Sequence, residues 1–152
     1  MQIPVHHSSH AGRTAILTGA AGGIGLGIGR TLAQRGARVI LVDRSAAVTD
    51  AARDLAAEGV DVCAWELDVR DEAGVRELIA AAQREWGGPD ILVNNAAIHP
   101  KNEGERQGAA AIATAQWDEV LVVNLTAVFV LCREVLPGMQ ARGWGAQPAA
   151  SR

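Results

Sequence analysis

The sequence has 152 residues, of which 49% are hydrophobic and 3% aromatic, and its formal net charge is −3. This length suffices for one domain with a hydrophobic core, and the charge gives no reason to expect a nucleic acid or an anionic membrane as partner. No apolar run approaches the roughly 18 to 20 residues of a membrane span, and the N-terminal residues lack the apolar segment of a signal peptide, so we expect a cytoplasmic protein.

Residues 1–12 form a polar leader that we expect to be disordered. Its histidines His6, His7 and His10 could bind a metal, but a disordered leader accounts for them more simply. Cys63 and Cys132 lie far apart in the sequence, whereas metal-binding and redox cysteines are usually closely spaced. We therefore predict reduced thiols and no metal site.

The stretch 14–29 predicts a strand, a tight turn and the start of a helix. Its apolar residues 15–17 lead into the pattern T-G-x-x-x-G-x-G, formed by Thr18, Gly19, Gly23 and Gly25. Glycines in such a turn let the main chain approach a phosphate closely, and a helix start offers unpaired N–H groups and the positive end of a dipole. We expect this turn to bind the pyrophosphate of a dinucleotide.

Two other interpretations of this stretch are open. The pattern G-x-G-x-G at Gly25, Gly27 and Gly29 is typical of methyltransferases that bind S-adenosylmethionine, but there the first glycine lies at the strand end, where this chain has Gly19. A flexible turn without a ligand is the plainer alternative. Gly27 and Gly29 fall inside the predicted helix, where glycine is unfavourable, and we expect them to let the helix pack closely on the sheet.

A helix is predicted at 23–35 and ends at Gly36. Its sheet-facing residues are expected to be Ile24, Ile28, Leu32 and Ala33. The β-branched run 37–42 then predicts a buried parallel strand.

Asp43 closes this second strand at its carboxyl end. A carboxylate there can accept hydrogen bonds from both ribose hydroxyls of an adenosine and repels a 2′-phosphate, so NAD is favoured over NADP. Arg44 weakens this inference, because a neighbouring guanidinium could receive a phosphate. The alternative is that Asp43 only begins a turn.

A helix at 46–58 and a strand at 60–67 follow, and the strand leads into Asp68 and Val69. Asp68 could bind the amino group of an adenine or cap the next helix, and we favour the first. That helix, at 71–86, is amphipathic. Its apolar stripe consists of Val75, Leu78, Ile79, Ala82 and Trp86.

A fourth strand is predicted at 90–94 and continues to residue 97. Asn94 and Asn95 stand at its end, and buried amides need partners. We expect them to tie neighbouring loops together while their backbone approaches the cofactor. Strands that alternate with helices form right-handed βαβ units, so the sequence predicts an α/β fold with helices on both faces of a parallel sheet.

Residues 98–113 are expected to form a loop that closes over a substrate. His99 could act there as an acid or base, although a solvated histidine is the simpler interpretation. Thr114 can cap the following helix, which extends towards Gly143 and precedes an unstructured tail at 146–152. Asn124 is the polar member of its apolar face and must hold a backbone group or a water. The helical stripe comprises Trp117, Val120, Leu121, Asn124, Val128, Leu131 and Val135.

Residues 13–145 together resemble the short-chain dehydrogenase/reductase family. The resemblance implies a Rossmann-type, doubly wound sheet, incomplete at about four strands, and an NAD(P)-binding domain spanning these residues. Residues 18–25, TGAAGGIG, are similar to the family's cofactor loop and include Ile24; Asp43 matches the acid that selects NAD. Asn124 matches an asparagine of the family's catalytic tetrad. The implied cofactor-binding set is Thr18, Gly19, Gly23, Ile24, Gly25, Asp43, Arg44, Asp68, Val69, Asn95, Ala96 and Ala97, where Ala97 replaces the usual glycine.

The resemblance also implies a serine and a Tyr-x-x-x-Lys motif on later elements. This chain has no tyrosine, and its single lysine is Lys101 in the loop. A positioned general acid or base contributes on the order of 10²- to 10⁴-fold in rate. We therefore expect an oxidoreductase by descent, acting on a small alcohol or carbonyl compound, whose present chain does not turn over and is truncated or frame-shifted.

The alternative is a non-catalytic dinucleotide-binding module. Because the fourth strand would lack an outer neighbour, we also expect its open edge to promote self-association. The helix at 114–142 resembles the one through which family members assemble, so a homo-oligomer is expected.

Overall fold

The computed structural model describes residues 9–102, 105–106 and 108–143. The predicted tail at 146–152 and most of the predicted leader lie outside the described residues. Residues 9–12 form a turn, in which the N–H of His10 donates to the carbonyl of Arg35 at 3.0 Å. This turn therefore packs with the folded domain.

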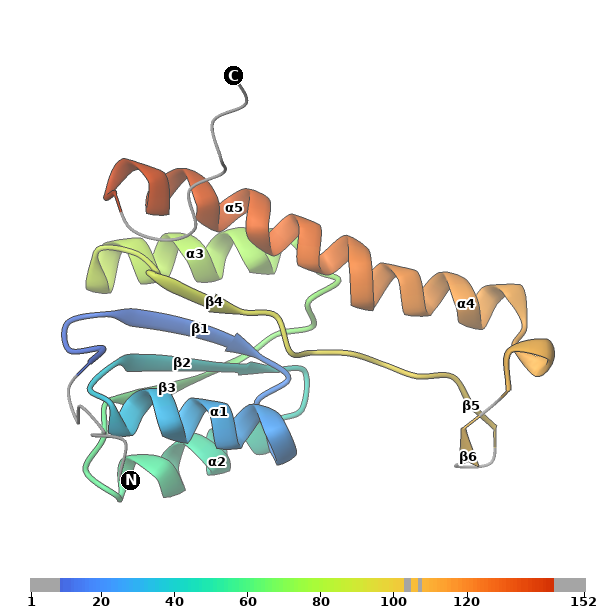
Figure 1. The fold of residues 1–152 in the computed structure, drawn as a ribbon, viewed down its shortest axis with the longest axis horizontal. Coiled ribbons are helices and arrows are strands. Elements are labelled where there is room, and N and C mark those ends of the chain that lie inside the picture. The colour runs from blue at the N-terminus through green and yellow to red at the C-terminus, as the bar shows by residue number, and fades with distance from the viewer. Residues whose placement is uncertain (1–8, 103–104, 107, 144–152) are drawn as a thin grey trace, which may run out of the picture.

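Four parallel strands form the central sheet in the order β3-β2-β1-β4 (Figure 1). Thr18 lies opposite Val42, and Asp43 lies opposite Glu66, so the carboxyl ends of the strands share one rim. This confirms the predicted α/β fold with an incomplete parallel sheet. The strands are β1 (Thr14–Thr18), β2 (Arg38–Asp43), β3 (Val62–Glu66) and β4 (Ile91–Val93).

Helices cover both faces of the sheet (Figure 1). On one face lie α1 (Gly23–Gln34) and α2 (Ala47–Ala56), and on the other lie α3 (Glu72–Trp86) and α5 (Ala127–Ala141). Side chains of β1 alternate between the two cores, since Leu17 packs with residues of α1 and α2 while Ile16 packs with residues of α3 and α5. This two-sided burial explains why the strands are almost continuously apolar.

The sheet-facing side of α1 differs from the prediction. Ile24 is 78% exposed, and the buried residues are Gly25, Gly29 and Ala33. A methyl group added at Gly29 would lie 2.7 Å from Cδ2 of Leu41, so the helix packs on the sheet through its glycines. Ile28 and Leu32 are only partly buried beside the same core. The predicted close-packing role holds for Gly29, whereas Gly27 is exposed.

The predicted stripe of α3 is confirmed, because Val75, Leu78 and Ala82 are fully buried and Ile79 and Trp86 pack against them. Asp71 caps this helix by accepting hydrogen bonds from the N–H groups of Ala73 and Gly74. The alternative that Asp68 caps the helix is therefore wrong.

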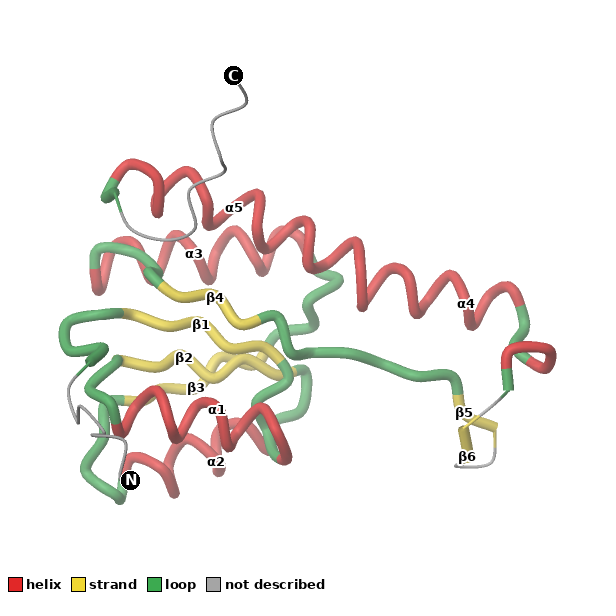
Figure 2. The backbone as a smooth tube through the Cα atoms, viewed as in Figure 1, coloured by secondary structure: helices red, strands yellow, loops and turns green. Residues whose placement is uncertain are grey.

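The chain after β4 leaves the sheet as an extended segment rather than continuing the strand to residue 97 (Figure 2). The predicted loop then contains three short elements within its described residues. These are the antiparallel strands β5 (Lys101–Asn102) and β6 (Glu105–Arg106) and the 3₁₀ turn η1 (Ala109–Ala111).

The long C-terminal helix is interrupted. It consists of α4 (Thr114–Leu121), a π-helical turn η2 (Val122–Thr126) and α5. Thr114 is the first helical residue and not the cap, because Ala113 precedes the helix and donates its N–H to Oε1 of Gln116 at 3.1 Å.

The predicted stripe of this helix is wrong in its first half. Helix α4 extends beyond the carboxyl ends of the strands and has no buried residue (Figure 1). Trp117 is 51% exposed, and Asn124 in the π turn is exposed as well. The buried residues are Val123, Ala127, Val130, Leu131, Val135 and Met139.

The segment Thr114–Ala141 is, by length and composition alone, long and apolar enough to cross a membrane, and an 18-residue window within it has a mean hydropathy of 1.9. The expectation that no apolar run approaches the length of a membrane span is therefore wrong for this segment, in which polar residues interrupt the run. Arg133 on this segment pairs with Glu72 on α3 at 3.1 Å, and buried residues of the same segment belong to the domain core. These contacts are those of a core helix in a folded domain.

Candidate cofactor site

Glycine is required both in the loop between β1 and α1 (residues 19–22, the glycine loop) and in the first turn of α1. Gly19 has a φ of +68°, and a methyl group there would lie 2.8 Å from Cα of Ala96. A methyl group at Gly25 would lie 2.1 Å from the carbonyl oxygen of Gly19. Helix α1 begins after Gly22 with no side-chain cap and no acidic residue in its first turn. Its N-terminus is therefore suited to an anion.

Asn95 fastens this loop to the end of β4. Its Nδ2 donates to the carbonyl oxygens of Thr18 and Gly19 at 3.0 Å each, as predicted for an amide that ties neighbouring loops. The N–H groups of Asn95 and Ala96 both donate to Oγ1 of Thr18 at 3.1 Å. Because Thr18 is 1% exposed, its side chain holds the loop rather than facing the cavity.

Asn94 takes a different direction from Asn95. Its Nδ2 lies 3.6 Å from Sγ of Cys132 on α5, and its Oδ1 is buried with no hydrogen-bond partner.

Both cysteines, Cys63 and Cys132, are free thiols, as predicted. Burial raises the pKa of Cys63.

Asp43 reaches the glycine loop from the end of β2. Its Oδ2 accepts from the N–H of Ala21 at 3.0 Å, and its Oδ1 accepts from the N–H of Ser45 at 3.0 Å. A carboxylate has about four lone-pair positions, so these two bonds leave room for further donors. The predicted neighbourhood of Asp43 and the glycine loop is therefore present.

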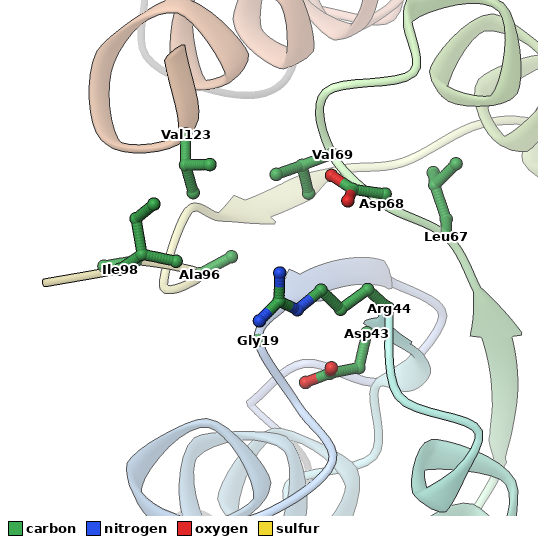
Figure 3. A pocket seen from close by; sticks show the side chains of 10 residues that line it. Gly19, Asp43, Arg44, Leu67, Asp68, Val69, Ala96, Ile98 and Val123 are labelled. Atoms are coloured by element: carbon green, nitrogen blue, oxygen red, sulfur yellow. The ribbon is translucent and has the colours of Figure 1, made fainter. Parts of the chain in front are cut away.

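A cavity of about 130 Å³ lies where the strand ends meet. Figure 3 shows the side chain of Arg44 reaching across this cavity above Asp43, with Asp68 and Val69 on another side. Ligand pockets usually measure roughly 300–1,000 Å³, so this cavity is large enough for only part of a ligand of that size. It is lined by Gly19, Asp43, Arg44, Leu67, Asp68, Val69, Ala96, Ala97, Ile98 and Val123.

The structure separates the predicted site residues into two groups. Seven of them line the cavity: Gly19, Asp43, Arg44, Asp68, Val69, Ala96 and Ala97. The others do not line it: Thr18, Gly23, Ile24, Gly25, Asn95 and Asn124. Sequence reasoning missed the lining residues Leu67, Ile98 and Val123. Each adjoins a predicted site residue in the sequence, and that adjacency was the available signal.

Asp68 is held by Arg70. Arg70 donates its backbone N–H and its Nε to the carboxylate at 3.0 Å, and its Nη2 lies 2.6 Å from Oδ2. Hydrogen bonds from the Arg70 side chain hold the pKa of Asp68 below its ordinary value. Asp68 therefore stays ionised in the folded protein.

Asn124 clamps the segment that follows β4. Its Oδ1 accepts from the N–H of Ile98, and its Nδ2 donates to the carbonyl of Ile98, each at 2.9 Å. Of the two predicted alternatives, a backbone group or a water, the structure shows the backbone group. His99 is exposed, and its Nδ1 lies 2.9 Å from the carbonyl oxygen of Pro100.

Comparison with known proteins places this arrangement in a family. The family model for short chain dehydrogenases matches residues 13–146. The chain belongs to the short-chain dehydrogenase family.

Curated members of this family extend well beyond the present chain. D-beta-hydroxybutyrate dehydrogenase of Cupriavidus necator is 39% identical over 140 residues, which cover 88% of this chain and 50% of that protein. Gluconate 5-dehydrogenase of Gluconobacter oxydans is 36% identical over 138 residues, covering 90% of this chain and 52% of the relative. The chain thus spans about half the length of these relatives.

Solved structures of the family share the fold. A metagenomic short-chain oxidoreductase in complex with NADP matches with a TM-score of 0.82 and 31% identity, covering 91% of this chain and 61% of that one. L-Sorbose reductase from Gluconobacter frateurii, complexed with NADPH and L-sorbose, matches with a TM-score of 0.80 and 33% identity, covering 91% and 51%. The short-chain dehydrogenase fold of these neighbours therefore accommodates a nicotinamide dinucleotide.

We predict opposite effects on stability for alanine substitutions at Gly25 and Gly27. We expect Gly25→Ala to destabilise the protein by about 2 kcal/mol or more, because the added methyl group collides with backbone. Gly27→Ala adds the same group where nothing lies within 4 Å, and it should stabilise the helix by up to about 1 kcal/mol. Urea denaturation followed by circular dichroism measures both. Equal effects of the two substitutions would contradict the described loop.

Proposed function

We propose that this chain binds a nicotinamide dinucleotide, with the adenosine half in the cavity between the glycine loop and Asp68. The observation that carries this proposal is the carboxylate of Asp43, which is bonded to the glycine loop at Ala21 on the rim of the parallel sheet. In open α/β sheets, ligands bind in the crevice at the carboxyl ends of the strands. The NADP and NADPH complexes of two solved relatives support the same ligand class.

Each part of the site has a proposed role. The pyrophosphate lies over Gly19, Gly23, Ile24 and Gly25, where the unpaired N–H groups at the start of α1 attract it. Asp43 accepts the ribose hydroxyls. Asp68 and Val69 contact the adenine. The segment Asn95–Ala96–Ala97 brings its backbone close to the cofactor, while the amide of Asn95 keeps the loop in place.

We propose NAD rather than NADP as the preferred cofactor. The support is the negative charge of Asp43, which a 2′-phosphate would meet directly. Arg44 opposes this preference, since its guanidinium reaches across the same cavity (Figure 3). The hydrogen bonds from Ala21 and Ser45 fix the orientation of the Asp43 carboxylate, which supports the proposed contact with the ribose.

The reaction of the family to which we assign the chain is hydride transfer between nicotinamide and a small alcohol or carbonyl compound. Such a reaction also needs a group that moves a proton to or from the substrate oxygen. The chain has no tyrosine and one lysine, Lys101. Asn124 matches an asparagine of the family's catalytic tetrad, but its side chain is hydrogen-bonded to the backbone of Ile98, so we assign it the role of positioning this segment. We therefore propose that the 152-residue chain binds cofactor without turnover.

A second proposal, a self-associating cytoplasmic module, rests on the surface of the long helix. Leu125 and Phe129 are 63% and 60% exposed, and Val122 and Leu136 extend the same stripe. Burying an exposed Leu or Phe contributes about 1.5–3 kcal/mol, so a second copy would cover this stripe favourably. The outer edge of β4 is unpaired within the described residues, which adds backbone groups available to a partner.

Cofactor preference is tested by titrating NADH and NADPH while following their fluorescence. We expect NADH to bind at least about tenfold more tightly than NADPH, since one unfavourable charge contact of about 1.4 kcal/mol gives that ratio. Asp43→Asn should shift the ratio about tenfold towards NADPH. The matched control, Asp54→Asn on α2, makes the same chemical change away from the cavity and should leave the ratio unchanged. If neither dinucleotide binds, the proposed function is wrong.

The absence of turnover is tested with the same preparation once it binds NADH. We expect no NADH formation from NAD and a panel of secondary alcohols that includes 3-hydroxybutyrate and gluconate, because no positioned group takes the proton. Sustained turnover would refute this proposal and would direct attention to His99 and Lys101.

Self-association is tested by light scattering coupled to size exclusion. We expect the wild-type chain to form dimers or larger species, and the double variant Leu125→Glu/Phe129→Glu to be monomeric, because the two charges interrupt the apolar stripe. Ala56→Glu adds a charge on α2, across the sheet, and should leave association unchanged. A monodisperse wild-type monomer would count against the association proposal.

A further inference from the structure

Most hydrogen-bond acceptor positions of the Asp68 carboxylate are occupied by donors of the protein itself. Its Oδ1 accepts from the backbone N–H of Arg70 and from Nε, each at 3.0 Å. Its Oδ2 accepts from Nε at 3.0 Å and from Nη2 at 2.6 Å. Three N–H groups of one residue therefore hold both oxygens in a single orientation.

Arg70 is itself held from a second element. Its Nη1 lies 3.5 Å from Oε1 of Glu119 on α4, while its Nε and Nη2 face Asp68. Asp68 lines the cavity, whereas Arg70 does not. The guanidinium thus grips Asp68 from outside the cavity, and Glu119 restrains it from turning away.

These hydrogen bonds limit the number of acceptor positions that Asp68 has free for a ligand. A carboxylate has about four lone-pair positions, and the three N–H groups of Arg70 supply hydrogens for three of them, because the single Nε hydrogen is shared between the two oxygens. One position is left for a ligand. The pKa of an aspartate lies well below neutral pH, and the hydrogen bonds from Arg70 lower it further, so the carboxylate of Asp68 can only accept hydrogen bonds near neutral pH. A ligand group that meets this position must therefore be a donor.

We propose that Arg70 is a positioning residue that makes this end of the cavity selective for a purine with an N–H donor at position 6 over one with a carbonyl at position 6. The 6-amino group of adenine is such a donor, and the 6-carbonyl of hypoxanthine is not. Arg70 acts through Asp68 without touching the base. The inference rests on the proposed dinucleotide site and deepens it, because it assigns base selectivity to a residue outside the cavity.

The test compares NADH with reduced nicotinamide hypoxanthine dinucleotide, which carries hypoxanthine in place of adenine. In fluorescence titrations of the wild-type chain, we expect NADH to bind about tenfold more tightly, as for one hydrogen bond to a charged acceptor. Arg70→Ala should reduce this ratio to about two- to threefold, because Asp68 is then free to rotate. Arg70→Lys keeps the charge but not the planar fork, so it should restore the ratio only in part.

Two further variants complete the comparison. Arg76→Ala removes an exposed arginine of α3 that does not line the cavity, and it should keep the wild-type ratio. Glu119→Gln leaves the cavity intact and weakens the restraint on Arg70, so it should reduce the ratio about twofold. This variant also carries the test if circular dichroism shows that Arg70→Ala does not fold.

The outcomes separate this inference from the proposed function. If the wild-type chain binds neither dinucleotide, the proposed function is wrong, and so is the inference that rests on it. If both bind and Arg70→Ala leaves the ratio unchanged or raises it, only the role of Arg70 is overturned. Carboxyl ¹³C titration by NMR is independent of any ligand: the midpoint of Asp68 should rise in Arg70→Ala, and an unchanged midpoint would show that the grip is absent in solution.

Discussion

The site depends on the contact between the glycine loop and the end of β4. The amide of Asn95 donates to two successive carbonyls, those of Thr18 and Gly19, while the hydroxyl of Thr18 accepts two N–H groups from the β4 side. Buried backbone groups of a loop need such partners, because water does not reach them. Gly19 must lack a side chain for the two segments to approach this closely. The loop is therefore held in shape before any ligand arrives.

Hydrogen bonds fix the orientation of the two carboxylates that line the cavity. Asp43 is fixed by two backbone N–H groups, and Asp68 is fixed by Arg70. Both carboxylates are thus oriented acceptors, which suits a ligand that presents hydroxyl and amino groups. Preorganised acceptors bind such groups with little further ordering cost. The pyrophosphate would lie at the other end, where the first turn of α1 has no acidic residue to repel it.

The long helix connects the site to the surface. Its π turn carries Asn124, whose amide holds Ile98, and Val123 from the same turn lines the cavity. Beyond the turn, α4 places Glu119 beside Arg70 and leaves Trp117 exposed. The exposed apolar residues for which we propose self-association therefore lie on the helix that also supports the cavity.

The sequence by itself determined the order of the elements, the parallel α/β fold and the identity of the rim residues. Glycine and acidic residues directly after apolar runs are local signals, and parallel strands bring their carboxyl ends together whatever the rest of the chain does. Asp43 and Asn95 were placed correctly for this reason. The role of Asp68 was left open between an adenine contact and the cap of α3, because Asp68 lies within a few residues of the helix start.

Only the tertiary structure decided which faces are buried and which polar groups pair. Ile24 was expected against the sheet, but the close approach of α1 to β1 and β2 admits only glycine and alanine on that face. The first half of the predicted stripe of the last helix is not buried because α4 extends beyond the sheet, which no periodicity reveals (Figure 1). The grip of Arg70 on Asp68 and its restraint by Glu119 join elements distant in sequence. Such pairings follow from how helices and strands pack, and sequence spacing does not encode them.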